Sequence, residues 1–376
     1  MRRPILCLLA LSLVLALSPA HALEMQTPAR QAILIDYDTG TVLLEKDADV
    51  PMPPASMSKL MTVLMVFERL KDGRLSMEDT FPISKKAWKM GGSKMFVEVG
   101  KSVSVGDLLK GIIVQSGNDA CIVVAEGIAG TEEAFATAMT ERGREIGLTN
   151  SNFRNASGWP AEGHRMSARD LALLAMRMIR EHPEHYALFS ERSFTYSGIK
   201  QGNRNPLLYK KVGADGLKTG HTEESGYGLV ASATRDGRRL VLVVNGLESV
   251  NQRSRESERL INWGFRQFKN YALFSAGEEV SRAKVWLGDL SEVPLVIDRD
   301  LAVTLPLSAR KGLDVQVVYD GPVPAPIRKG DPIASLQIGA PGMAAITIPL
   351  KAGDDVGRLG FFGRLTAMLM HRVTGD

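Results

Sequence analysis

The sequence contains little cysteine and histidine and carries only a small excess of positive charge. There are 2 cysteines and 6 histidines in 376 residues. The His, Cys and carboxylate residues show no spacing typical of a metal site, and no glycine-rich phosphate-binding loop occurs. We therefore expect neither a metal nor an organic cofactor. The formal net charge of +4 gives no reason to expect nucleic acid as a partner.

The first 22 residues are typical of a secretory signal peptide. Arg2 and Arg3 form its basic start, residues 5–17 its apolar middle, and Ala20-His21-Ala22 the small-x-small cleavage site. The apolar middle is too short to span a bilayer comfortably. Cleavage would remove two arginines and so lower the net charge from +4 to +2.

Cleavage would also remove Cys7 and leave Cys121 as the single cysteine. A disulfide within one mature chain is therefore excluded. Cys121 lies in an apolar run, so we expect it to be a small buried hydrophobic residue.

The remaining residues predict two domains and a terminal helix. Residues 23–272 combine strand and helix patterns and predict a mixed α/β (α+β) domain. Within it, helices are expected at about 56–72, 105–114, 119–128, 132–146, 167–180 and 254–271, and strands at 32–36, 42–45, 217–221, 227–234 and 239–247. Residues 275–355 contain short β-like runs separated by Pro and Gly, which predicts a small all-β domain.

Residues 356–376 predict an amphipathic helix that lies in a membrane interface. Its broad apolar side contains Phe361, Phe362, Leu365, Met368, Leu369 and Val373. The segment also contains three arginines, which argue against a helix that spans the bilayer.

The first chemical motif is Ser56-x-x-Lys59, which follows a proline-rich stretch and opens an apolar run. Residues three apart share one face of a helix. A hydroxyl and an amine placed in this way can act as nucleophile and base, and the helix dipole should help to lower the lysine pKa. The pattern recurs at Ser197, Ser281 and Ser308, so it is weak evidence by itself.

Two further motifs follow in order and strengthen this interpretation. Ser116-x-Asn118 lies 60 residues after Ser56, and Lys218-Thr219-Gly220 lies 102 residues after Ser116. The Lys-Ser/Thr-Gly triplet occurs once in the chain. These three motifs together are the signature of β-lactamases and penicillin-binding proteins.

With these motifs the chain resembles the low-molecular-mass penicillin-binding proteins, the serine-type D-alanyl-D-alanine carboxypeptidases of peptidase family S11. The resemblance covers nearly the whole chain, from the signal peptide through S-M-S-K, S-G-N and K-T-G-H-T to the β-rich domain and terminal helix. It implies a β-lactamase/transpeptidase-like catalytic domain, in which an antiparallel sheet carries a helical subdomain.

The resemblance also implies roles for individual residues. Ser56 would attack the carbonyl between two terminal D-alanines, and Lys59, if neutral, would accept its proton. Like-charge repulsion from Lys218 would help to lower the pKa of Lys59. Ser116 would relay the proton to the departing amine, and Asn118 would hold the lysine and the substrate amide.

The substrate-binding residues implied by the resemblance lie on the strand of the third motif and on two arginines. They are Lys218, Thr219, Gly220, His221, Arg204 and Arg253. The N–H groups of Ser56 and of about His221 would form the oxyanion hole. Arg255 is a rival to Arg253 for the substrate carboxylate.

Other polar residues receive no catalytic role. We expect Asp170 to cap its helix or to order the neighbouring loop, and we assign no role to the loop 155–159. His164 and His221 invite a Ser-His interpretation, but no Gly-x-Ser-x-Gly elbow surrounds any serine.

The implied activity is removal of the terminal D-alanine from peptidoglycan pentapeptide stems, with β-lactam antibiotics as acylating inhibitors. The implied location is the periplasm, where the terminal helix would attach the protein peripherally to the inner membrane. A DD-endopeptidase, a β-lactamase and a catalytically weak wall-binding scaffold are the alternatives. No loop glutamate suited to fast β-lactamase deacylation is evident.

Overall fold

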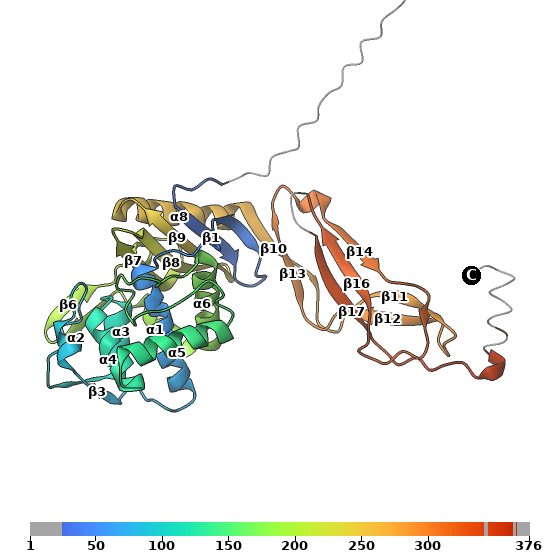
Figure 1. Ribbon diagram of the computed structural model, residues 1–376. Helices are drawn as coiled ribbons and strands as arrows, with labels where there is room; N and C mark the ends of the chain where they lie inside the picture. Colours follow the sequence, from blue (N-terminus) through green and yellow to red (C-terminus); the bar gives the residue numbers. More distant parts are fainter. Residues whose placement is uncertain (1–24, 342–344, 364–365, 367–376) are drawn as a thin grey trace, which may run out of the picture.

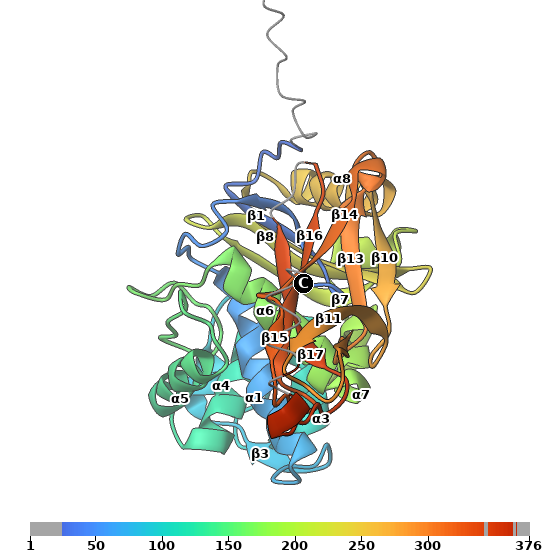
Figure 2. The same ribbon diagram turned by 90° about the vertical axis from the view of Figure 1, so that its right-hand side faces the viewer.

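The chain folds into two domains that lie next to each other (Figure 1). The computed structural model describes residues 25–341, 345–363 and 366. The predicted signal peptide and most of the predicted terminal helix lie outside the described residues. The view in Figure 2 shows the second domain in front of the first. A mixed α/β domain followed by a small all-β domain confirms the predicted fold class.

The first domain is built on a five-stranded antiparallel sheet in the order β2-β1-β9-β8-β7. Its strands are β1 Gln31–Asp36, β2 Val42–Lys46, β7 Ala214–Thr222, β8 Gly226–Arg235 and β9 Arg238–Leu247. Pairing of β1 with β9 joins the two ends of the domain. It also leaves β7 as an edge strand, with one side open for a further strand.

Both faces of this sheet are covered by helices, so its strands are apolar on both sides. In β9, Val241 and Val243 pack into the core on the side of the helical subdomain. Leu240 and Leu242 alternate with them and pack into the core beneath α8 (Val250–Gln267). The period of two residues explains why one strand supplies both cores.

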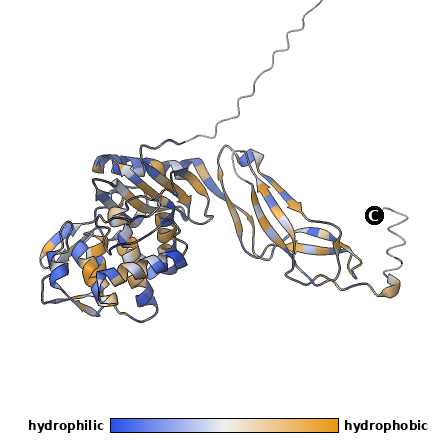
Figure 3. Ribbon diagram, viewed as in Figure 1, coloured by the Kyte–Doolittle hydropathy of each residue, from blue (hydrophilic) through white to orange (hydrophobic). Residues whose placement is uncertain are grey.

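The helical subdomain surrounds helix α1 (Lys59–Lys71), in which every residue from Lys59 to Phe67 is buried. The other helices are α2 Lys85–Lys89, α3 Val105–Ile113, α4 Asn118–Ala129, α5 Glu132–Glu145, α6 Ala168–Glu181 and α7 Pro183–Tyr186. Short hairpins β3–β4 (Thr80–Pro82, Ser102–Ser104) and β5–β6 (Ser193–Tyr196, Ile199–Gly202) complete it. Figure 3 shows α3 as largely hydrophobic and the outer helix α5 as largely polar.

Two of the predicted helices have wrong bounds. Helix α8 begins and ends one turn before the predicted 254–271, because the Ser249 hydroxyl caps it by accepting a hydrogen bond from the Gln252 N–H at 3.1 Å. Phe268 is already in a strand. The predicted terminal helix also begins later, because Val356 and Arg358 form bridges to Ile327 and Gly288.

The second domain is a β structure with its own hydrophobic core. Its strands are β10 Phe268–Phe274, β11 Glu279–Trp286, β12 Glu292–Val296, β13 Leu301–Pro306, β14 Asp314–Val318, β15 Val323–Pro324, β16 Pro332–Gly339 and β17 Ile346–Ala352. The pair β10–β13 lies nearest the first domain (Figure 1). There, Asn270 donates a hydrogen bond to the buried Asp36 carboxylate at 3.1 Å, which ties the two domains together.

Near the end of the described chain, residues 361–363 form a short helical turn that is coloured hydrophobic in Figure 3. The side chains of Phe361 and Phe362 are 69% and 82% exposed. Within the described part of the chain, none of the helices combines the length and the apolarity that crossing a bilayer requires.

Candidate active site

The first predicted motif forms a contact between a hydroxyl and an amine. Ser56 lies in a single 3-10 turn, η1 (Ala55–Ser58), and Lys59 begins α1 directly after it. The Lys59 Nζ donates a hydrogen bond to the Ser56 Oγ at 2.9 Å. The Ser56 side chain is partly exposed, whereas Lys59 is completely buried. Ala55 has a φ of 48°, an uncommon conformation for a residue other than glycine, which sets the direction of this turn.

Lys59 contacts oxygen atoms that carry no charge. Its Nζ donates to the Asn118 Oδ1 at 2.7 Å and to the backbone carbonyl of Ser157. Asn118 is the first residue of α4, and its Nδ2 donates to the Gly91 carbonyl at 3.0 Å. The amide is therefore held in the orientation that presents its oxygen to the lysine.

Ser116 lies in the turn between α3 and α4 and has a φ of 60°. Its hydroxyl is buried and has no hydrogen-bond partner among the described residues. A buried hydroxyl without a partner and a left-handed backbone are both costly, and such features cluster at functional sites. Next to the fixed amide of Asn118, the Ser116 hydroxyl is therefore free to bond a ligand.

The third motif lies on the edge strand β7. Lys218 and Thr219 are buried, with 3% and 6% of their surfaces exposed, and the Lys218 Nζ donates to the Thr219 carbonyl at 3.2 Å. His221 is exposed and stacks on Tyr227, with ring centroids 3.9 Å apart. An extended peptide could pair with the open edge of β7.

The two lysines of the site have lowered pKa values. Burial lowers the pKa of Lys59 from 10.5 to about 8. Burial also lowers the pKa of Lys218, and the charges of Lys59 and Arg204 lower it further. Burial, rather than the predicted repulsion from Lys218, is the main cause of the shift at Lys59.

The two candidate arginines for a substrate carboxylate differ in burial. Arg253 faces the sheet and is 6% exposed, with its guanidinium carbon 5.8 Å from the centre of the Tyr227 ring. Its Nε has no partner in the described structure, and burial lowers its pKa to about 10. Arg255 is exposed on the outer side of α8. Arg204 donates to the Ser93 hydroxyl at 2.5 Å and contributes positive charge to the same region.

Two groups that help to hold the site were not predicted from the sequence. The loop 155–159 was expected to have no role, but the Ser157 carbonyl accepts a hydrogen bond from Lys59. Asp119 is buried, and its carboxylate accepts hydrogen bonds from the N–H groups of residues 95–97 at 2.8–3.2 Å. A backbone carbonyl belongs to every residue type, so the sequence could not have indicated the role of Ser157. Asp119, in contrast, is an acidic residue next to Asn118 and could have been noticed.

Asp170 orders the neighbouring loop, as expected. Its carboxylate accepts hydrogen bonds from the Asn150 N–H at 2.8 Å and the Ser151 hydroxyl at 2.7 Å. Cys121 is buried and free, also as expected, and burial raises its pKa to about 12. In the described ranges, no group of three or more His, Cys, Asp or Glu side chains could hold a metal ion.

Two family models match the two domains of this chain. A family model described as D-alanyl-D-alanine carboxypeptidase matches residues 18–249, and one described as penicillin-binding protein 5, C-terminal domain, matches residues 268–361. D-alanyl-D-alanine carboxypeptidase DacC of Escherichia coli (strain K12) is 39% identical over 350 residues, which cover 91% of this chain and 88% of that protein.

Solved structures agree with these matches. Penicillin binding protein 5 from Haemophilus influenzae has a TM-score of 0.82 and 37% identity, covering 89% of this chain and 99% of that chain. Penicillin-binding protein D2 from Listeria monocytogenes in its ampicillin-bound form has a TM-score of 0.59 and 30% identity, covering 64% of this chain and 99% of that chain. The family resemblance indicated by the motifs is confirmed.

Close packing of β7 against η1 gives a first prediction. A Cβ added at Gly220 would lie 2.9 Å from the Pro54 carbonyl oxygen and 3.0 Å from the Met57 Cγ. Gly220→Ala should therefore push the turn that carries Ser56 away from β7 and slow acylation by a fluorescent penicillin, by about 100-fold if the shift approaches 1 Å.

Gly339→Ala is the matched control, because a Cβ at Gly339 meets no atom within 4 Å. It should leave the acylation rate unchanged. Equal acylation rates for wild type and Gly220→Ala would show that this packing does not position Ser56.

Proposed function

The chain belongs to the D-alanyl-D-alanine carboxypeptidase family of serine peptidases, and on that premise we propose that Ser56 is its nucleophile. The chain would remove the terminal D-alanine from peptidoglycan pentapeptide stems through an acyl-enzyme on Ser56. β-Lactams would acylate the same hydroxyl. The observation that carries this proposal is the 2.9 Å contact between the Ser56 Oγ and the buried Lys59 Nζ.

Lys59 is suited to act as the base. A pKa of about 8 leaves roughly one amine in ten neutral at pH 7, and the neutral amine can accept the Ser56 proton as the Oγ attacks the carbonyl. The acceptors around the amine are neutral oxygens, and among the described residues no carboxylate forms an ion pair with it.

The departing D-alanine needs a proton on its nitrogen. The Ser116 hydroxyl, which has no partner in the described structure, would pass a proton from Lys59 to this nitrogen as the C–N bond breaks. Water would then attack the ester carbonyl, with Lys59 accepting its proton, and release Ser56 and the shortened stem. Asn118 would hold the lysine and the substrate amide during both steps.

The substrate would pair with the open edge of β7. Thr219 and Gly220 would lie beside it, and the N–H groups of Ser56 and His221 would bind the oxyanion. Its terminal carboxylate would meet the positive charges of Lys218, Arg204 and Arg253. Binding of this anion would raise the pKa of Lys218 and leave Lys59 as the neutral member of the pair.

The direct test is release of D-alanine from a pentapeptide-stem muropeptide, measured by mass spectrometry. Wild type should release one alanine, and Ser56→Ala should release none while keeping the thermal midpoint of the wild type. Hydrolysis of cross-linked dimers or of penicillin in place of the pentapeptide would assign the protein to one of the other activities of this family.

The burial difference between two arginines on α8 gives a matched pair of variants. Arg253→Gln should lower kcat/KM for D-alanine release by roughly 10–100-fold, because a charge-assisted hydrogen bond contributes about 1.5–3 kcal/mol. Arg255→Gln changes an exposed residue and should remain within about twofold of wild type. If Arg255→Gln lowers kcat/KM more than Arg253→Gln does, Arg255 rather than Arg253 would bind the substrate carboxylate.

We also propose that the protein acts in the periplasm, attached to the inner membrane by its C-terminal segment. The exposed Phe361 and Phe362 side chains and the apolar side predicted for the residues after them support this location. Deletion of 361–376 leaves the bridges of Val356 and Arg358 in place.

The truncated protein should therefore keep its penicillin acylation rate but no longer sediment with vesicles that contain anionic lipid. Sedimentation of the truncated protein to the extent seen with the full chain would contradict attachment through this segment.

A further inference from the structure

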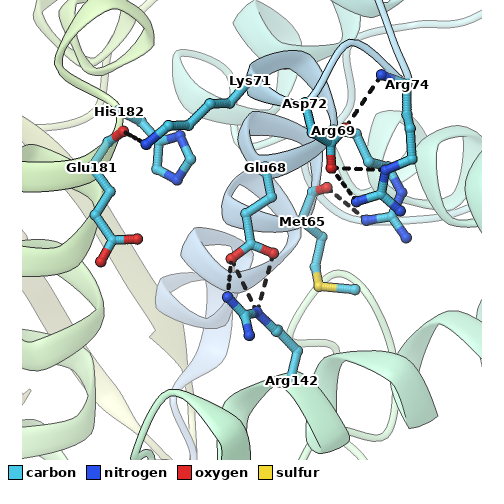
Figure 4. Close-up of a pocket in the computed structure, with 9 residues that line it drawn as sticks. All are labelled: Met65, Glu68, Arg69, Lys71, Asp72, Arg74, Arg142, Glu181 and His182. Atoms are coloured by element: carbon cyan, nitrogen blue, oxygen red, sulfur yellow. Dashed lines mark hydrogen bonds and ion pairs between the residues drawn. The ribbon is translucent and has the colours of Figure 1, made fainter.

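A cavity of about 650 Å³ lies at the end of α1 opposite the candidate active site. It is lined by Met65, Glu68, Arg69, Lys71, Asp72, Arg74, Arg142, Glu181 and His182 (Figure 4). None of the residues assigned to the reaction lines it. Because α1 has 13 residues, its two ends are about 20 Å apart. The cavity is therefore separate from the site of Ser56.

The carboxylates that line the cavity already have cationic partners. The ion pairs are Glu68–Arg142 at 2.8 Å, Asp72–Arg74 at 2.5 Å and Glu181–Arg177 at 3.0 Å. The carboxylates of the cavity are thus already paired with arginines of the protein. A cationic ligand would have to compete with these guanidinium groups.

Arg69 and Lys71 bind backbone carbonyls instead of carboxylates. The Arg69 Nη1 donates to the Met65 carbonyl at 2.8 Å, and the Lys71 Nζ donates to the Glu181 carbonyl at 2.9 Å. In the described structure neither cation lies within ion-pair distance of a carboxylate. A guanidinium has five N–H donors and an ammonium three, so most donors on both groups are available to a ligand.

The imidazole of His182 provides a second, independent observation at this cavity. Its side chain lines the cavity and the residue is 4% exposed, yet neither ring nitrogen has a hydrogen-bond partner among the described residues. Buried polar atoms are nearly always bonded. Figure 4 shows the imidazole beside Lys71, so both groups face the same side of the cavity.

The spare donors form two separate groups. Figure 4 shows Lys71 and His182 on one side of the Glu68–Arg142 pair and the guanidinium group of Arg69 on the other. A peptide that carries two carboxylates would offer one to each group. We propose that this cavity binds an acidic peptide segment through two carboxylates.

The test is calorimetric titration of the full chain with a blocked peptide, acetyl-Glu-Gly-Glu-amide, at low ionic strength. The peptide has no free carboxyl terminus and so lacks the terminal carboxylate by which a substrate stem would bind at the active site, and acylation of Ser56 tests whether its side-chain carboxylates bind there. Binding should be weakened at least tenfold by the double variant Arg69→Gln/Lys71→Gln. It should be unchanged when Ser56 has first been acylated with ampicillin, and it should weaken as salt is added.

Three controls make the result specific. Acetyl-Gln-Gly-Gln-amide should not bind, and Lys269→Gln/Lys284→Gln, which removes two exposed lysines of the second domain, should bind like wild type. The charge-preserving variant Arg69→Lys/Lys71→Arg should retain most of the affinity, which separates loss of charge from loss of fold.

The proposal fails if the acidic peptide does not bind at millimolar concentration, or if Arg69→Gln/Lys71→Gln binds it as wild type does. If the cavity binds inorganic phosphate but not the peptide, the acidic-peptide proposal is wrong and the ligand is a phosphate. These outcomes are independent of D-alanine release, so a failure here leaves the proposed catalytic function untouched.

Discussion

The first domain depends on keeping one amine buried without a counter-ion. Lys59 is completely buried, and each of its hydrogen-bond acceptors is a neutral oxygen. A charged ammonium in this position would lose its hydration without gaining an ion pair, so the neutral form is favoured. The turn of Ser56, the start of α4 at Asn118 and the carbonyl of Ser157 must all meet at this amine.

This arrangement also suggests a role for the other cations of the site. Lys218, Arg204 and Arg253 surround the region with positive charge, and burial lowers the pKa of each. Among the described residues no carboxylate forms an ion pair with any of them. The free site is therefore electrostatically incomplete, and an anionic substrate end would supply the missing charge while leaving the amine of Lys59 neutral.

Local signals predicted much of the fold, whereas long-range contacts of the site escaped prediction. Apolar periodicity located the central strands and most helices, and the cap at Ser249, which shifts α8, was readable but overlooked. The spacing of Ser56 and Lys59 predicted their contact, because three residues make about one helical turn. The carbonyl of Ser157 lies 98 residues from Lys59 in sequence, and a backbone acceptor can belong to any residue type. The main cause of the Lys59 pKa shift also required the packed structure.

The pH dependence of ampicillin acylation tests the neutral-lysine account most directly. The second-order rate constant, measured by stopped flow, should rise with pH as Lys59 loses its proton and should reach a plateau above its pKa of about 8. The folded-state pKa is lowered, so the active neutral form gains population at a lower pH than a free lysine would allow. A midpoint near 10.5, or a rate independent of pH between 6 and 10, would contradict a neutral Lys59 as the base.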